Sequence, residues 1–323
     1  MRRTRGALVA AAISVSIAIT TLMIIVLGLA HERASAAPTI SFITPTPVAT
    51  FTSGTLLVRR FGSGTNTIVL IPGLSSGPWE FATMIRALAV NSTVFALTLP
   101  GFDGQPTITA PYLPRVTDDI WAMLASQHST MPVIIGHSLG GTLAYLLAEQ
   151  HPHRLRGIVS IDGLPVFPGT ENLTPATRLM RAKYMTTFFK SMTTAQFDAS
   201  NMRYMDSIGT RNSMLATQMA TFADRSDSTA VGEYAGEDLG LDLRPHAKDI
   251  TIPVLLISPY NAADYAHPPL DISAMQKATY YKQLTVGVPN EKIVTVSPSR
   301  HYAQIDQPEQ VQAAIDAFIS GLH

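Results

Sequence analysis

Short, β-branched apolar segments alternate with longer amphipathic segments along most of this 323-residue chain. The apolar segments mostly end at Gly, Pro or Ser, and the segments between them carry apolar residues at helical spacing. Strands that are apolar on both faces need helices on both sides of a mostly parallel sheet. The sequence therefore predicts an α/β fold. Its expected strands are residues 66–73, 92–101, 131–138, 155–163, 250–258 and 291–299.

The alternation is interrupted between Leu164 and about Lys248, where no strand pattern occurs. This region favours helices and is rich in methionine, so we expect a helical insertion between two strands. Methionine side chains adapt to irregular spaces, and here they could either pack against the sheet or line a deformable apolar pocket. The methionines in question are Met180, Met185, Met192, Met202, Met205, Met214 and Met219.

The N-terminus has a different composition from the rest of the chain. The basic start MRRTR precedes a run from Gly6 to Ala30 without a charged residue, and Ala34-Ser35-Ala36 resembles a cleavage site. This pattern predicts that residues 1–36 are either a signal peptide or an N-terminal membrane anchor, with membrane association through residues 6–30. Both alternatives predict an exported protein, periplasmic, extracellular or anchored with its folded domain outside the cytoplasm.

Residues 37–53 are rich in Pro, Thr and Ser, which predicts a linker before a folded domain at 54–323. Basic and acidic residues number 23 each, so the chain lacks the cationic excess of proteins that bind nucleic acid, and we expect no such partner. Cysteine is absent, which excludes disulfides, thiolate metal sites and a cysteine nucleophile.

The segment Gly136-His137-Ser138-Leu139-Gly140 lies where an apolar strand changes into a helical pattern. A strand that turns this sharply into a helix needs small residues on both sides of the turn, and it raises the serine hydroxyl above the sheet. The helix that follows directs its first N–H groups toward negative charge developing there. The motif therefore predicts that Ser138 is a catalytic nucleophile.

With this motif the chain resembles the α/β-hydrolase superfamily, and in particular its serine esterase and lipase-like members that carry GHSLGG. The segments VLIPGLSSGPWEF (69–81) and LTLPGFDGQP (97–106) resemble further family segments in the expected order. The resemblance extends from about Gly54 to Leu322. It implies an α/β-hydrolase fold with a mostly parallel central sheet and helices on both faces.

The resemblance also implies two functional features. Family members carry a helical cap at the position of residues 164–248, and they hold the oxyanion with backbone amides. In this chain those amides belong to Leu74 and Leu139. Many relatives have His-Gly where this chain has Pro72-Gly73, which leaves the Leu74 amide unaffected.

A serine hydroxyl becomes a good nucleophile only when a base removes its proton. His301 follows the last expected strand and precedes the last helix, where the family places its base. His267, in a loop, is the alternative by chain order. His137 is expected to point away from the nucleophile in a structural or modulating role, and His151 and His153 lie at a helix end.

The acid that orients the base is expected between the nucleophile and the histidine in the chain. We prefer Asp264, which follows the strand at 250–258, and keep as alternatives Asp162 after the preceding strand and Asp227 in the cap. Asp306 and Glu309 resemble a capping pair for the last helix.

Together these features predict a serine hydrolase that cleaves an uncharged carboxylic ester, or a related acyl bond, through an acyl-enzyme on Ser138. This chemistry needs neither a metal nor an organic cofactor, and the expected partner is a small ester substrate. The alternatives are a cofactor-free haloperoxidase-like enzyme, a C–C bond hydrolase, or a catalytically silent hydrolase-fold protein that binds a ligand.

Overall fold

The computed structural model describes residues 40–266 and 271–322, in which eight strands form one sheet. The strand order is β1-β2-β4-β3-β5-β6-β7-β8. Strand β2 runs antiparallel to β1 and β4, and every other pair is parallel. The predicted α/β fold is confirmed. The strands are β1 (Ala49–Ser53), β2 (Leu56–Phe61), β3 (Asn66–Ile71), β4 (Ser92–Thr98), β5 (Val133–His137), β6 (Gly157–Ile161), β7 (Val254–Pro259) and β8 (Glu291–Val296).

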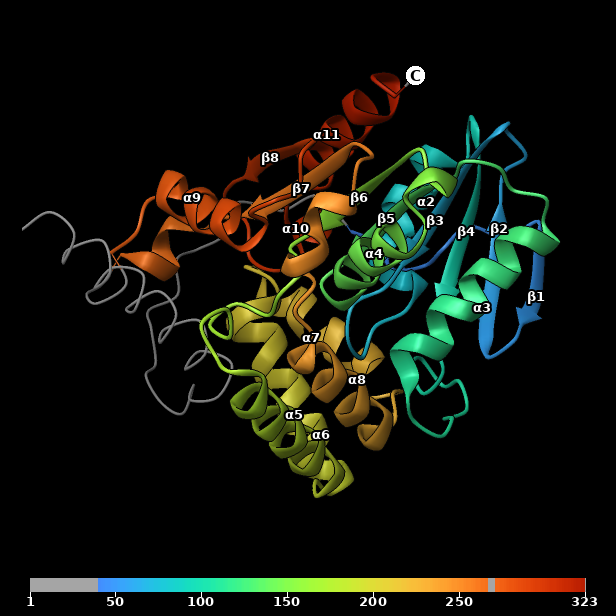
Figure 1. Cartoon of the computed structure of the whole chain (residues 1–323). Coiled ribbons are helices and arrows are strands. Elements are labelled where there is room, and N and C mark those ends of the chain that lie inside the picture. Colours follow the sequence, from blue (N-terminus) through green and yellow to red (C-terminus); the bar gives the residue numbers. More distant parts are fainter. Residues whose placement is uncertain (1–39, 267–270, 323) are drawn as a thin grey trace, which may run out of the picture.

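Helices cover both faces of the sheet (Figure 1), because alternate residues of each strand point to opposite sides. On β3, Ile68 and Leu70 join the core under α2 and α11, whereas Val69 and Ile71 join the core under α3 and α4. Helix α9 packs on β7 and β8. These helices are α2 (Ala82–Leu88), α3 (Tyr112–Ser126), α4 (Leu139–Gln150), α9 (Ala274–Leu284), α10 (Ala303–Asp306) and α11 (Pro308–Ser320).

The folded domain begins before the boundary that composition suggested. Residues 49–53, assigned to the linker, form the edge strand β1 and pair with β2. Phe42 is also buried, and its ring packs edge-on against Trp79 and Phe222. The predicted start near Gly54 is therefore wrong, because the Thr- and Ser-rich composition hid two alternating apolar residues that suit an edge strand.

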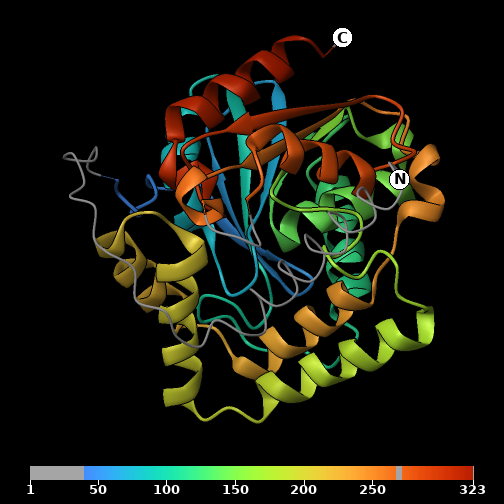
Figure 2. The ribbon, with the colours of Figure 1, turned by 90° about the vertical axis from the view of Figure 1, so that its left-hand side faces the viewer.

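The chain between β6 and β7 folds into a layer of helices, which we call the cap. It consists of α5 (Pro175–Lys190), α6 (Thr194–Tyr204), a π-helical turn η3 (Met205–Gly209), α7 (Ser213–Ala223) and α8 (Ser228–Gly240). The cap lies at the carboxyl ends of the parallel strands (Figure 1), and Figure 2 shows it at the opposite end of the molecule from α11.

The cap methionines divide between core and surface. Met205 and Met219 are buried in a cluster with Trp79 and Tyr302, whereas Met180 and Met214 are exposed. The cap methionines as a group therefore do not line a single pocket, which was one of the two arrangements expected from the sequence.

The predicted signal peptide or anchor, residues 1–36, lies outside the described residues. Within residues 40–266 and 271–322, no helix is both long enough and apolar enough to cross a membrane.

The turn from β5 into α4 is packed against the neighbouring strand β3. A Cβ added to Gly136 would lie 1.9 Å from the carbonyl oxygen of Gly140, and one added to Gly140 would lie 2.1 Å from that of Ile71. Both distances are far below van der Waals contact, and the opposing atoms belong to the backbone. Each glycine is therefore needed for the close approach of strand, turn and helix.

We expect Gly140→Ala to lower the free energy of unfolding by ~2–3 kcal/mol, because the added methyl group would push α4 away from β3. Urea denaturation measures this change. Gly240→Ala is the matched control, because its Cβ would lie 3.7 Å from the Cβ of Ala182, an ordinary contact. Equal stability of the two variants would contradict the packing argument.

Candidate active site

Ser138 occupies a strained turn between β5 and α4. Its backbone has φ 52° and ψ −119°, a combination that residues other than glycine rarely adopt. The Ser138 N–H donates to the Ile161 carbonyl at 2.8 Å, and the Ser138 carbonyl accepts from the N–H of Gly141 at 2.8 Å. These bonds to β6 and α4 hold the turn in place.

Parallel strands end at one edge of the sheet, so the residues that follow them meet there. Ser138 follows β5, Asp162 follows β6, and His301 follows β8. The structure joins two of these by a hydrogen bond of 2.6 Å between His301 Nδ1 and Asp162 Oδ2. The other carboxylate oxygen, Oδ1, accepts from the Tyr281 hydroxyl at 2.5 Å. Asp162, the alternative acid in the sequence analysis, thus contacts the histidine.

Asp264, the preferred acid, is placed differently. Its carboxylate accepts from Arg300 Nη2 at 2.8 Å and from Arg300 Nε at 3.0 Å, so the two side chains form a bidentate ion pair. Asp264 lies in the short helix η5 (Ala262–Tyr265), several residues beyond the end of β7. The structure therefore pairs Asp264 with Arg300, and it is Asp162 rather than Asp264 that contacts His301.

The remaining acid candidates have other partners. The Asp227 side chain accepts from the Ala230 N–H and caps α8. Asp306 was expected to cap the last helix, but that helix has no side-chain cap. The Asp306 carboxylate instead accepts from the Thr210 hydroxyl at 2.5 Å and from the Arg300 N–H at 2.8 Å.

The electrostatics of the Asp162–His301 pair favour a neutral imidazole beside a carboxylate. Burial would raise the pKa of Asp162, but the charge of Lys277 and the hydrogen bonds from His301 and Tyr281 outweigh it and hold that pKa below its ordinary value. Burial lowers the pKa of His301 in spite of the nearby carboxylate. Nδ1 of His301 therefore carries the proton that Asp162 accepts, which leaves a lone pair on Nε2.

The loop after β3 passes next to the serine. A Cβ on Gly73 would lie 3.3 Å from Ser138 Cβ and 2.8 Å from His137 Nδ1. Leu74 follows in this loop, and Leu139 is the first residue of α4, so its N–H has no acceptor within the helix. Both residues predicted to supply oxyanion amides thus belong to segments that adjoin Ser138.

Two buried ionisable side chains, Glu80 and His137, connect this loop to His301. Glu80, in the 3₁₀ helix η1 (Pro78–Phe81), accepts from the Gly73 N–H at 3.0 Å and bonds His137 Nδ1 at 3.0 Å. His137 Nε2 lies 3.2 Å from the carbonyl oxygen of His301. His137 has the structural position that was predicted for it.

The cap holds the backbone of the histidine directly. The His301 N–H donates to the Ile208 carbonyl at 3.1 Å, and the Tyr302 N–H donates to the Gly209 carbonyl at 2.9 Å. Both acceptors belong to the π-helical turn η3. Turns of this type occur often at functional sites.

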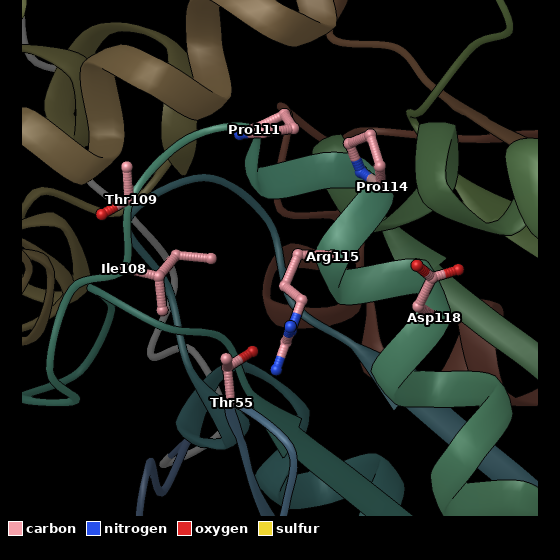
Figure 3. A pocket seen from close by; sticks show the side chains of 7 residues that line it. All are labelled: Thr55, Ile108, Thr109, Pro111, Pro114, Arg115 and Asp118. Carbon is pink, nitrogen blue, oxygen red and sulfur yellow. The ribbon is translucent and has the colours of Figure 1, made fainter.

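One further hollow of the described structure lies away from these residues. A surface groove of about 550 Å³ lies between the β1–β2 turn and the start of α3 (Figure 3), and its lining contains none of the residues discussed above. The described residues hold no cluster of three or more His, Asp or Glu side chains suited to a metal ion. His267, the alternative base, lies outside the described residues. The groove is lined by Thr55, Ile108, Thr109, Pro111, Pro114, Arg115 and Asp118.

The sequence model of the alpha/beta hydrolase family matches residues 68–314. The chain belongs to this family. It is 24% identical over 273 residues to a pimeloyl-[acyl-carrier protein] methyl ester esterase of Aeromonas hydrophila, covering 81% of this chain and 98% of the relative. Accordingly we assign the chain as a hydrolase enzyme.

Solved structures of hydrolases share the fold of this family member. The structure of a hydrolase from Oleispira antarctica has a TM-score of 0.65 and 16% identity, covering 82% of this chain and 94% of that one. A thermophilic esterase from Thermogutta terrifontis has a TM-score of 0.60 and 17% identity, with coverages of 83% and 94%. At these identities the likeness shows the fold.

Three side chains near the site were missed in the sequence analysis. Glu80 is a charged residue within the apolar segment PWEF, which is itself a signal for a buried role. Lys277 and Tyr281 lie one turn apart on α9 and face the same side, but the segment carries no recognisable motif.

Asp238 on α8 lies next to Thr142 on α4, where the cap meets the sheet. Burial raises the pKa of Asp238 from 3.8 to about 7 against the opposing effect of Thr142. The folded protein therefore retains this proton over a pH range in which the unfolded chain has lost it. Folding stability falls as pH rises from about 4 to about 7, the window between these two values.

We expect Asp238→Asn to abolish this loss of stability. The free energy of unfolding of the variant should exceed that of the wild type by roughly 2–4 kcal/mol at pH 8 and equal it near pH 4. Urea denaturation across this range measures the difference. Asp118→Asn, which removes an exposed carboxylate from α3, is the matched control. A pH-independent difference between Asp238→Asn and the wild type would contradict the assignment.

Proposed function

We propose that the protein is a serine hydrolase that cleaves an uncharged carboxylic ester through an acyl-enzyme on Ser138. One observation carries the proposal. The 2.6 Å hydrogen bond between His301 Nδ1 and Asp162 Oδ2 lies at the sheet edge where the strained Ser138 turn is formed. A nucleophile, a base and an acid that orients the base are the three parts of this chemistry.

In the first half-reaction, Ser138 Oγ attacks the carbonyl carbon of the ester and its proton passes to His301 Nε2. Asp162 stabilises the imidazolium that forms, and the backbone N–H groups of Leu74 and Leu139 donate to the oxyanion. The tetrahedral intermediate collapses as His301 gives its proton to the departing alkoxide oxygen. An alcohol leaves, and the acyl group remains bonded to Ser138.

In the second half-reaction, a water molecule gives its proton to His301 Nε2 and attacks the acyl carbon. The same backbone donors stabilise the second oxyanion. His301 then returns the proton to Ser138 Oγ as the carboxylic acid is released. The cycle consumes one water and one ester and leaves the enzyme unchanged.

Three features support an ester as the substrate. Two of the compared proteins are named as esterases. The chain has no net charge, and its cap places Met205 and Met219 in an apolar cluster with Tyr302, the neighbour of the proposed base. An apolar environment next to the reacting group favours an uncharged, fairly apolar substrate over an anionic one.

Ser138→Ala is expected to lower kcat for p-nitrophenyl esters by ~10⁶-fold without loss of the fold. Circular dichroism checks the fold, and peptide mass mapping locates the adduct of a fluorophosphonate probe. We expect the adduct on Ser138 of the wild type and on neither His301→Ala nor Ser138→Ala. A folded wild type that stays unlabelled, or a variant that still turns over, would contradict the proposal.

The two aspartates are separated by a matched pair of substitutions. Asp162→Asn is expected to lower kcat by ~10⁴-fold, because an amide in place of the carboxylate fails to hold the base in its productive tautomer. Asp264→Asn weakens only the ion pair with Arg300, and we expect kcat to stay within about threefold of the wild type. The reverse order of these two effects would return the role to Asp264.

A further inference from the structure

Lys277 is a buried lysine close to the Asp162–His301 pair, and the mechanism above does not use it. It lies on α9, and only 7% of its surface is exposed. Lysine is almost never buried to this degree without compensation, because moving an ammonium group out of water is costly. Its surroundings must therefore stabilise the charge.

The ammonium group is held by contacts from two sides. Nζ donates to the Pro259 carbonyl at the end of β7 at 2.5 Å. It also lies 5.1 Å from the ring centroid of Tyr281 and 6.0 Å from that of Tyr265, within the range of cation–π attraction. In the described part of the chain, no carboxylate comes within salt-bridge distance of Nζ.

Tyr281 links this cation to the carboxylate of Asp162. Its hydroxyl donates to Asp162 Oδ1, while its ring faces the ammonium of Lys277. Lys277 and Tyr281 are four residues apart on α9, so one helix presents both to the carboxylate. His301 contacts the other carboxylate oxygen, Oδ2, so Tyr281 and His301 bind different oxygens of Asp162.

A buried carboxylate draws positive charge toward itself. Two groups can supply that charge at Asp162, either a protonated His301 or Lys277. If His301 supplied it, the imidazole would be protonated at rest and unable to accept the proton of Ser138. With Lys277 present, the negative charge of the Asp162 carboxylate is compensated, and Nε2 of His301 keeps its lone pair.

We propose, on the basis of the triad proposed above, that Lys277 is the resting counter-ion of Asp162 and acts with Tyr281 as a positioning pair. Lys277 keeps Asp162 ionised and His301 neutral, so that His301 is ready to act as a base. Neither side chain touches the reacting atoms. Their effect reaches the reaction through the protonation state of His301.

The electrostatics of the site agree with this role. The charge of Lys277 is the largest influence that lowers the pKa of Asp162, and it also contributes to lowering the pKa of His301. The other titratable side chains around the pair are His137 from β5, Tyr204 from α6, Glu80 from η1, Tyr281 from α9 and Tyr302, which follows His301. Of all these groups, Lys277 is the one that carries a permanent positive charge at neutral pH.

The test is Lys277→Met, which leaves an unbranched apolar side chain one heavy atom shorter and removes the charge. We expect the pKa of His301 to rise by one unit or more, since the imidazolium becomes the only cation beside Asp162. The pKa reported by the acid limb of the kcat/KM profile should rise by the same amount. Below the new pKa, kcat/KM should then fall about tenfold or more relative to the wild type, and it should recover at alkaline pH. Lys277→Arg keeps the charge and should retain the wild-type profile.

The pKa of His301 is measured without turnover, by NMR titration of the full chain labelled with ¹³C at histidine Cε1. The His301 signal is identified by its absence from His301→Gln. A wild type that shows this titration but hydrolyses no ester would sink the proposed function and leave the role of Lys277 standing. A folded Lys277→Met protein whose His301 titrates as in the wild type would overturn the role of Lys277.

Two further variants keep the test decisive. Lys282→Met is the matched control, because Lys282 lies on the same helix with 53% of its side chain exposed, and it should leave the pKa of His301 unchanged. If Lys277→Met does not fold, Tyr281→Phe replaces it, since it removes only the hydroxyl that donates to Asp162. We expect a smaller shift of the same sign, and its absence would overturn the role of the pair.

Discussion

The buried carboxylate of Asp162 is the group on which the geometry of the candidate site depends. One oxygen accepts from His301 and the other from Tyr281, so both are satisfied. A buried charge is tolerated only when it is paired and hydrogen-bonded in this way. Because the carboxylate stays ionised, the proton of the imidazole is drawn to Nδ1 and Nε2 is left as the acceptor. The chemistry proposed for Ser138 follows from this choice of tautomer.

The backbone carries strain at the two turns that hold Ser138 and Asp162. Ser138 and Asp162 both have positive φ values, 52° and 54°, and they follow the neighbouring strands β5 and β6. The Ser138 N–H bonds the carbonyl of Ile161, the residue just before Asp162. Such strain persists only where the surrounding structure over-determines the backbone, and here the parallel sheet does so.

The cap is part of the site as well as a cover for it. Its π-helical turn accepts hydrogen bonds from the backbone of His301 and Tyr302, and Asp306 ties the cap residue Thr210 to the N–H of Arg300. His137 and Glu80 connect the same histidine to the Gly73 loop on the other side. A displacement of the cap would therefore move the proposed base relative to the Gly73 loop.

Local patterns in the sequence were sufficient for much of the fold and part of the site. The alternation of apolar and amphipathic segments predicted six of the eight strands in the described sheet, β3 to β8. It missed β1, a short edge strand with few apolar residues, and β2, whose apolar residues are interrupted by Arg59 and Arg60. Ser138 could be found because the strand, the turn and the helix around it are contiguous in the chain. His301 could be found because the resemblance places a base between the last strand and the last helix.

The choice between Asp162 and Asp264 lay beyond the sequence. Both aspartates follow a strand of the same sheet and precede His301, so chain order accepts either. Only tertiary structure separates their surroundings, because Arg300 pairs with Asp264, while α9 brings Tyr281 and Lys277 to Asp162. Periodicity and glycine spacing describe short-range geometry and can be read along the chain. The protonation and pairing of a buried charge depend on which groups from distant segments surround it, and only the folded chain brings those groups together.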